Sequence, residues 1–261
     1  MSNQATIEQA YAELTHAYHK HESIAPLTET FTTLDVAMAY DVQMKFINKK
    51  VNDGERVVGK KIGLTSFAMQ KLLGVDEPDY GHLLSQMEVK EGEAIEREAL
   101  FQPKIEGEIA FVLKQELKGP NVTVEDVLAA TDYIVPALEI VDSRIKDWKI
   151  KLPDTIADNA SCGLFVLGNQ KVNPTLIDMP SIAMKLYQNK QLINEGTGAD
   201  VLGHPGKCVA WLANQLAQYD VTLRAGEVIL SGALSAAVEV KSGDQITCEF
   251  TELGQVSTTF K

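Results

Sequence analysis

The spacing of apolar residues changes near residue 100, and this change constrains the fold more than any other feature. Before it, apolar residues recur every three or four positions, which is typical of amphipathic helices. After it, short apolar runs are separated by Gly, Pro, Asn and Asp, which is typical of strands and turns. No Pro/Gly/Ser-rich linker divides the two parts. We therefore expect a helical N-terminal cap that leads into a mixed α+β body made largely of sheet.

The same patterns predict the individual elements. The N-terminal part should contain helices over 6–21 and about 33–51, the second preceded by a capping box of Thr32 and Asp35. The further expected elements are a strand from Val57 to Leu64, a short helix between Ser66 and Gly74, strands over 105–113, 133–141 and 163–168, a hairpin over 182–195, helices that begin at Thr123 and Pro205, and a β-rich segment after residue 221.

Charge and composition exclude several classes of protein. Asp and Glu outnumber Lys and Arg by 36 to 24, a formal net charge of −12, which argues against nucleic acids and anionic membranes as partners. No apolar run of about 18 residues is present, and the polar N-terminus lacks the apolar core of a signal peptide. The three cysteines lie far apart without a CxxC pair, which indicates reduced thiols. We expect a cytoplasmic protein.

Several common catalytic motifs are missing. The sequence contains no GxGxxG, no phosphate-binding loop, no GxSxG and no HExxH. These absences weaken nucleotide-binding, serine-hydrolase and zinc-enzyme interpretations.

The most informative residues are three carboxylates at predicted strands. Glu106 and Glu108 point to the same face of one strand, roughly 6–7 Å apart, and that face becomes apolar at Ala110. Glu139 follows an apolar run on another predicted strand. Like charges in an apolar place raise each other's pKa unless a cation lies between them. Three hard oxygen donors suit Mg²⁺ or Mn²⁺, although Glu-x-Glu is also common on solvated faces, so spacing alone leaves both interpretations open.

Five blocks of sequence occur in order along the chain. They are 60–65 (KKIGLT), 77–81 (EPDYG), 103–110 (PKIEGEIA), 136–144 (PALEIVDSR) and 157–161 (ADNAS). Together they resemble one family, the hydratases and decarboxylases of the fumarylacetoacetase-like superfamily, and the similarity runs over nearly the whole chain from about residue 25. Members of this family include 2-hydroxypenta-2,4-dienoate (2-keto-4-pentenoate) hydratase and 4-oxalocrotonate decarboxylase of aromatic meta-cleavage pathways.

The resemblance implies a fold and a metal. The implied fold is α+β, a mixed β-sheet roll of the fumarylacetoacetase C-terminal type with a helical N-terminal cap. Residues 1–75 would form the cap region with the first strand, and residues 76–261 the catalytic roll, as one continuous structural unit. The resemblance also implies that Glu106, Glu108 and Glu139 bind one divalent cation, Mg²⁺ or Mn²⁺.

The resemblance also assigns roles to four other residues. Lys61 matches the active-site lysine of the family, and we expect it to donate and accept protons with a pKa lowered by burial or opposed by the metal's charge. Asp79 matches an acidic active-site position that could orient or deprotonate water. Ser161 lies in the loop that contacts substrate, and Lys60 is a further candidate for substrate binding.

The implied reaction is metal-dependent hydration of 2-hydroxypenta-2,4-dienoate, through its 2-oxo tautomer, to 4-hydroxy-2-oxopentanoate. Residues 142–151 and 160–168 resemble the hydratases, whereas Ser235-Ala236-Ala237-Val238 is also similar to the decarboxylases. Decarboxylation of 4-oxalocrotonate at the same metal site is therefore the alternative. A third hypothesis is a non-enzymatic scaffold, which the presence of all three glutamates argues against. The family further implies a homo-oligomer that can associate with the paired enzyme of its pathway.

Overall fold

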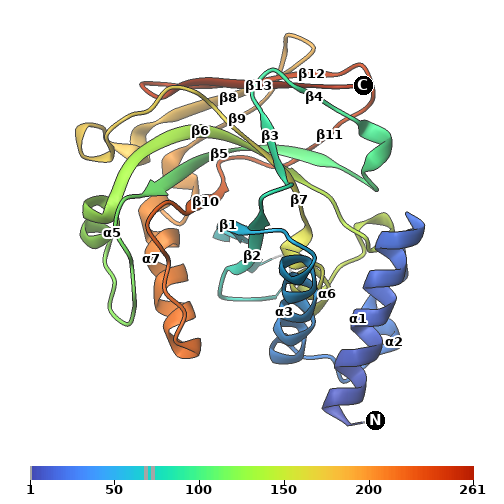
Figure 1. The fold of residues 1–261 in the computed structure, drawn as a ribbon. Coiled ribbons are helices and arrows are strands. Elements are labelled where there is room, and N and C mark those ends of the chain that lie inside the picture. The colour runs from blue at the N-terminus through green and yellow to red at the C-terminus, as the bar shows by residue number, and fades with distance from the viewer. Residues whose placement is uncertain (1, 68–69, 72–73) are drawn as a thin grey trace.

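A computed structural model describes residues 2–67, 70–71 and 74–261. In Figure 1, α1, α2, α3 and α6 lie on one side of the molecule and α7 on the other, with β1 and β2 between α7 and α3. Within the described residues, no helix is both long and apolar enough to cross a bilayer. The helices are α1 (Asn3–Lys20), α2 (Leu27–Thr30), α3 (Val36–Asn52), α5 (Val124–Ala130), α6 (Leu152–Ala157) and α7 (Pro205–Leu216).

The N-terminal helices agree with the prediction except at their starts. The helix predicted over 6–21 is α1, which begins earlier because the Ser2 hydroxyl accepts a hydrogen bond from the backbone N–H of Ala5. The prediction of a capping box formed by Thr32 and Asp35 was wrong. Asp35 is itself the N-cap, and its carboxylate accepts from the N–H of Met38 at 2.8 Å, so α3 begins at Val36 rather than 33.

Strands begin well before residue 100. They are β1 (Val57–Gly63), β2 (Asp79–Leu84), β3 (Glu88–Lys90) and β4 (Ala94–Ile95). Only β1 was predicted, so the expectation of a helical first hundred residues was wrong after α3. All six residues of β2 are buried, which removes the alternation that marks a strand, and β3 and β4 are too short to show a period. The helix predicted between Ser66 and Gly74 includes four residues outside the described part of the chain.

The C-terminal elements match the predicted pattern closely. Thr123 is the N-cap of α5, α7 begins at Pro205, and the predicted hairpin forms, whereas the six-residue α6 was missed. The strands are β5 (Lys104–Leu113), β6 (Thr131–Val141), β7 (Cys162–Leu167), β8 (Ala183–Gln188), β9 (Gln191–Thr197), β10 (Val228–Ala233), β11 (Val238–Glu239), β12 (Gln245–Phe250) and β13 (Gly254–Phe260).

The larger sheet curls into a roll. Its strand order is β2-β1-β10-β5-β6-β7-β3, with β11 paired to β5. The curl brings Leu83 of β2 and Phe165 of β7 into one apolar cluster with Ala110 and Ala137 of the central strands. The second sheet, in the order β4-β13-β12-β8-β9, packs against the other face of β5 and β6. The structure is therefore α+β with a helical N-terminal part, as expected.

The side chain of Gln43 joins the helical part to the roll. This fully buried residue of α3 donates from its amide nitrogen to the carbonyls of Tyr80, at 3.0 Å, and Ile156, at 2.8 Å. Its amide oxygen lies 3.0 Å from His82 Nδ1 and accepts the proton that this nitrogen carries. Burial lowers the pKa of His82 to about 3, so the ring stays neutral. One side chain thus links α3, β2 and α6.

Replacing Gln43 with Leu keeps a similar volume but removes these hydrogen bonds. Each buried polar group left unpaired costs about 1–3 kcal/mol, so we expect the free energy of unfolding to fall by at least about 2 kcal/mol. Urea denaturation followed by circular dichroism measures this change, with Gln4→Leu on the exposed face of α1 as the control. An unchanged free energy in Gln43→Leu would show that apolar packing alone holds the helical part.

Candidate metal centre

Two neighbouring strands bring the three predicted glutamates together. In the antiparallel pair β5–β6, Glu106 lies directly opposite Glu139. Glu108 lies two residues along β5 and therefore on the same face as Glu106. One oxygen from each of the three carboxylates lies within 4.8 Å of the others, and Glu108 and Glu139 are completely buried. The face becomes apolar at Ala110, as the sequence predicted.

Burial of like charges makes ionisation of this cluster unfavourable. Burial, then the charge of Glu139, raises the pKa of Glu106 to about 8. The same causes raise the pKa of Glu108 well above its ordinary value. Glu108 Oε2 accepts a hydrogen bond of 2.7 Å from the N–H of Gly232, which stabilises the ionised form only in part. Gly232 lies at a register shift in β10 with a φ of +109°, which glycine adopts without strain.

The cluster has the properties of a site for a hard divalent cation. Within the described residues, Glu108 Oε1 and Glu139 Oε2 have no hydrogen-bond partner, and Glu139 Oε1 has only an ion pair with Lys61. Such orphaned buried oxygens are rare in proteins and need an explanation. A divalent ion would neutralise most of the charge and use these oxygens as ligands, and oxygen-only donors favour Mg²⁺ over softer metals. The residues therefore fit a divalent cation.

The lysine predicted to be catalytic lies beside the cluster. Lys61 Nζ is 3.1 Å from Glu139 Oε1 and donates a hydrogen bond of 3.1 Å to the carbonyl of Ala160. Burial alone would lower the pKa of Lys61, but the carboxylates around it, Glu139 first, outweigh burial and raise the pKa above its usual value. In the metal-free chain, the predicted lowering by burial was therefore wrong, because the sequence did not show that the carboxylates surround this ammonium. The predicted effect of the metal's charge stays a prediction. Lys61 is a protonated acid at neutral pH.

A glycine makes room for the predicted acid of β2. Asp79 pairs with Gly63 across β1 and β2, and a Cβ on Gly63 would overlap Asp79 Oδ1 and lie 3.5 Å from Lys61 Nζ. Burial raises the pKa of Asp79, and its Oδ1 has no hydrogen-bond partner among the described residues. Gly63 was not predicted as a site residue. The available signal was a glycine inside a strand, which often marks a close approach of other groups.

The other two predicted residues lie in different places. Ser161 is buried directly after the carbonyl that Lys61 contacts, with its Oγ 3.2 Å from Thr155 Oγ1. Lys60 points to the opposite face of β1, where its Nζ lies 3.0 Å from Glu227 Oε2. The structure thus gathers the glutamates, Lys61 and Asp79, places Ser161 next to them, and places Lys60 apart.

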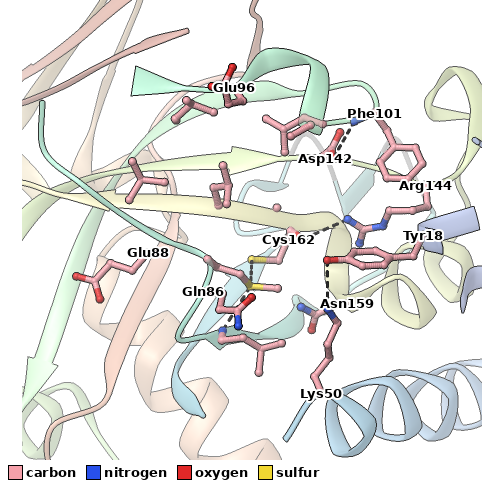
Figure 2. A pocket seen from close by; sticks show the side chains of 18 of the residues that line it. Tyr18, Lys50, Gln86, Glu88, Glu96, Phe101, Asp142, Arg144, Asn159 and Cys162 are labelled. Carbon is pink, nitrogen blue, oxygen red and sulfur yellow. Dashed lines mark hydrogen bonds between the residues drawn. The ribbon is translucent and has the colours of Figure 1, made fainter. Parts of the chain in front are cut away.

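A cavity of about 540 Å³ lies next to this region, between the helical part and the start of β7 (Figure 2). Asn159 and Cys162, which flank Ala160 and Ser161 in sequence, line the cavity together with Arg144. The three glutamates do not line it. The cavity therefore borders the segment that carries Ser161 rather than the carboxylates.

The metal-free protein is expected to lose stability as the pH rises. Between the ordinary pKa of 4.5 and the raised pKa of about 8, the folded chain keeps a proton on Glu106 that the unfolded chain has released, so stability falls across this range. Thermal unfolding with a chelator, from about pH 5 to about pH 8.5, measures the loss. Mg²⁺ should reverse it, and Glu106→Gln should flatten it. This account would be contradicted if the midpoint temperature of unfolding rose with pH in both the wild type and Glu106→Gln.

Sequence comparison relates the chain to known enzymes. Residues 74–261 match the family described as Fumarylacetoacetate (FAA) hydrolase C-terminal. The chain is 45% identical over 262 residues to a 2-hydroxyhexa-2,4-dienoate hydratase of Comamonas testosteroni, across 100% of this chain and 99% of that one. It is 50% identical over 210 residues to a 2-hydroxypent-2,4-dienoate hydratase of Pseudomonas putida, across 80% of this chain and 95% of that one.

Comparison with solved structures points to the same group of enzymes. A 4-oxalocrotonate decarboxylase from Pseudomonas putida G7, complexed with magnesium and adipate, superimposes with a TM-score of 0.95 at 36% identity and covers 100% of this chain and 99% of its own. The same enzyme complexed with calcium and acetate gives a TM-score of 0.94. The expected type of fold is thereby confirmed. The chain belongs to the fumarylacetoacetate hydrolase family, within its group of 2-keto-4-pentenoate hydratases and 4-oxalocrotonate decarboxylases.

Proposed function

We propose that this protein is a hydro-lyase that hydrates 2-hydroxypenta-2,4-dienoate, through its 2-oxo tautomer, to 4-hydroxy-2-oxopentanoate, with a divalent metal as cofactor. The observation that carries the proposal is the cluster of Glu106, Glu108 and Glu139 next to Lys61 and Asp79. The curated relatives at 42–50% identity include hydratases named for this substrate class, which supports the choice of reaction.

The three glutamates would hold the metal. When bound, a divalent ion supplies Lewis-acid polarisation of a 2-oxo acid and draws in an anionic substrate that this acidic protein would otherwise repel. Ser161 Oγ hydrogen-bonds the substrate carboxylate from the side of the loop. Lys60 is left out of this assignment, because its ammonium pairs with Glu227 on the other face of β1.

Lys61 and Asp79 carry the proton transfers. The raised pKa of Lys61 favours its ammonium form, so its Nζ delivers a proton to C5 while the 2-hydroxyl group of the dienol loses its proton to solvent, which gives the α,β-unsaturated ketone. Asp79 has a raised pKa and an unpaired Oδ1, so its carboxylate is a stronger base than an exposed aspartate and removes a proton from the water that attacks C4. Protonation at C3 by Lys61, recharged from solvent, completes the hydration.

Glu106→Gln tests the proposal. This variant keeps the shape of the side chain and removes one of three repelling charges, so the protein should fold while turnover falls by at least about 10²-fold, equivalent to about 2.7 kcal/mol of lost transition-state stabilisation. The ultraviolet absorbance of the dienoate, measured with Mg²⁺ and with chelator, reports turnover, and mass spectrometry identifies the product. Glu249→Gln on the exposed face of β12 is the control and should match wild type.

Two results would contradict the proposal. Wild-type turnover in Glu106→Gln would remove the metal assignment. Failure of the wild type to bind any divalent cation in a calorimetric titration would instead favour the scaffold hypothesis.

The alternative activity is decarboxylation of 4-oxalocrotonate, which the structural similarity to the adipate-bound decarboxylase keeps open. It would use the same metal-bound 2-oxo group as the electron sink, and it needs a site for a second carboxylate instead of a base for water. Supplying each substrate separately to the purified protein with Mg²⁺ distinguishes the two. We expect hydration of the dienoate without release of CO₂ from 4-oxalocrotonate, and the reverse result would replace our first choice.

Further expectations accompany the proposal and come from the sequence and the family resemblance. These are Mn²⁺ as a second suitable metal, a place in meta-cleavage catabolism, a cytoplasmic location, and a homo-oligomer that can associate with the paired decarboxylase. The division into a cap of residues 1–75 and a roll of residues 76–261 has the same status.

A further inference from the structure

The segment between α6 and β7 has an unusual backbone. Asn159, Ala160 and Ser161 are consecutive and none is glycine, yet their φ angles are +55°, +50° and +53°. Side chains disfavour this left-handed region, and such residues usually occur singly. A run of three persists only where the surrounding structure fixes it, and such strain concentrates at functional sites.

The side chain of Asn159 fixes the segment to β2. Its Oδ1 accepts a hydrogen bond of 2.8 Å from the N–H of His82, and its Nδ2 donates one of 2.9 Å to the carbonyl of the same residue. The amide thus pairs with the backbone of β2 as a neighbouring strand would. Gly81 permits this approach, because a Cβ there would overlap the carbonyl oxygen of Asn159. His82 is in turn held by Gln43.

The ends of the segment are fixed by Arg144. Its Nη2 donates to the carbonyl of Asp158 at 2.7 Å, and its Nη1 donates to the carbonyl of Cys162 at 3.3 Å. The Arg144 side chain extends toward Cys162 along the cavity wall, and Asn159 lies on the same wall (Figure 2). Ser161 is held separately, because its carbonyl accepts from the N–H of Asp142 at 2.8 Å and its Oγ lies 3.2 Å from Thr155 Oγ1. Asn159 thus fixes the start of the left-handed run to β2, and Arg144 fixes the residues on either side of it.

The arrangement determines where Lys61 is held. Between the fixed ends, the carbonyl of Ala160 accepts the hydrogen bond from Lys61 Nζ, whose other close partner is Glu139. If the backbone at Ala160 adopted the ordinary right-handed conformation, its carbonyl would point elsewhere. Lys61 would then lose its hydrogen bond to this uncharged acceptor. The ammonium would then be held by carboxylates alone.

We propose that Asn159 is a positioning residue, whose two hydrogen bonds to the backbone of His82 hold the Ala160 carbonyl against Lys61 and thereby set the place of its ammonium. This inference rests on the proposed function, in which Lys61 moves the protons. Among the described residues, no hydrogen bond joins the Asn159 side chain to the three glutamates. Asn159 therefore acts through Lys61.

The chain provides a matched control. Asn214 on α7 makes the same pair of hydrogen bonds to one backbone residue, accepting from the N–H of Val122 at 2.8 Å and donating to its carbonyl at 3.0 Å. Val122 lies in the loop beyond Leu113, at the end of β5 opposite to the glutamates. Replacing either asparagine with aspartate keeps the accepted bond and removes the donated one. Asn159→Asp also retains a residue that tolerates the left-handed region.

Two measurements compare Asn159→Asp with Asn214→Asp in the full-length protein. The first is the rate of reductive methylation of Lys61, followed by mass spectrometry of its peptide, which needs no substrate. We expect this rate to rise about tenfold in Asn159→Asp through local opening, and to stay at the wild-type value in Asn214→Asp. The second is dienoate turnover with Mg²⁺, where kcat should fall about 10²-fold in Asn159→Asp alone and KM should stay within about twofold.

The inference is overturned if Lys61 is methylated at the same rate in both variants, or if kcat is unchanged by Asn159→Asp in an enzyme that turns over the dienoate. A wild type without hydratase activity would instead remove the proposed function, and the methylation rates alone would then decide the inference. If Asn159→Asp does not fold, Asn159→Gly replaces it, because glycine adopts the left-handed region freely while lacking both hydrogen bonds.

Discussion

Repulsion between three buried carboxylates is the constraint on which this structure depends. Glu106 and Glu139 face each other across a strand pair, and Glu108 lies on the same face, so ionising all three without a cation is costly. The strands cannot separate to relieve this repulsion. Behind the glutamates, Gly107 faces the second sheet so closely that a Cβ would contact Cys248 Sγ. The fold therefore holds in place three carboxylates that fit a divalent cation.

The catalytic groups around this centre depend on close approaches of the backbone. Gly63 leaves room for Asp79, Gly81 leaves room for the Asn159 segment, and Gly232 turns its N–H toward Glu108. A side chain at Gly63 would displace Asp79, and one at Gly81 would displace the Asn159 segment. The arrangement of the site thus depends on small residues that carry no chemistry of their own.

The sequence predicted the parts of the site that follow the two-residue period of strands. Alternation placed Glu106 and Glu108 on one face and predicted the apolar residues beyond them, and the apolar run before Glu139 singled out this third carboxylate. Family resemblance joined the three in one metal site and added Lys61 and Asp79. Pairings between distant segments were not visible in the same way. The fully buried β2 shows no alternation, the six-residue α6 has fewer than two turns and is too short to show a helical period, and the left-handed turn at Asn159 is fixed by contacts with His82 and Arg144. The sequence likewise did not show that carboxylates from other strands surround the Lys61 ammonium and raise its pKa in the metal-free chain.

The neighbours of β1 have a consequence for the newly made chain. β1 lies between β2, which follows it directly, and β10, which pairs Leu230 with Lys61 near the end of the sequence. While the ribosome is still extending the polypeptide, one edge of β1 therefore has no partner until residue 228 has emerged. Prematurely terminated products keep that edge open to pairing with other chains, and they carry Lys61 on a strand that has not yet been fixed in its sheet.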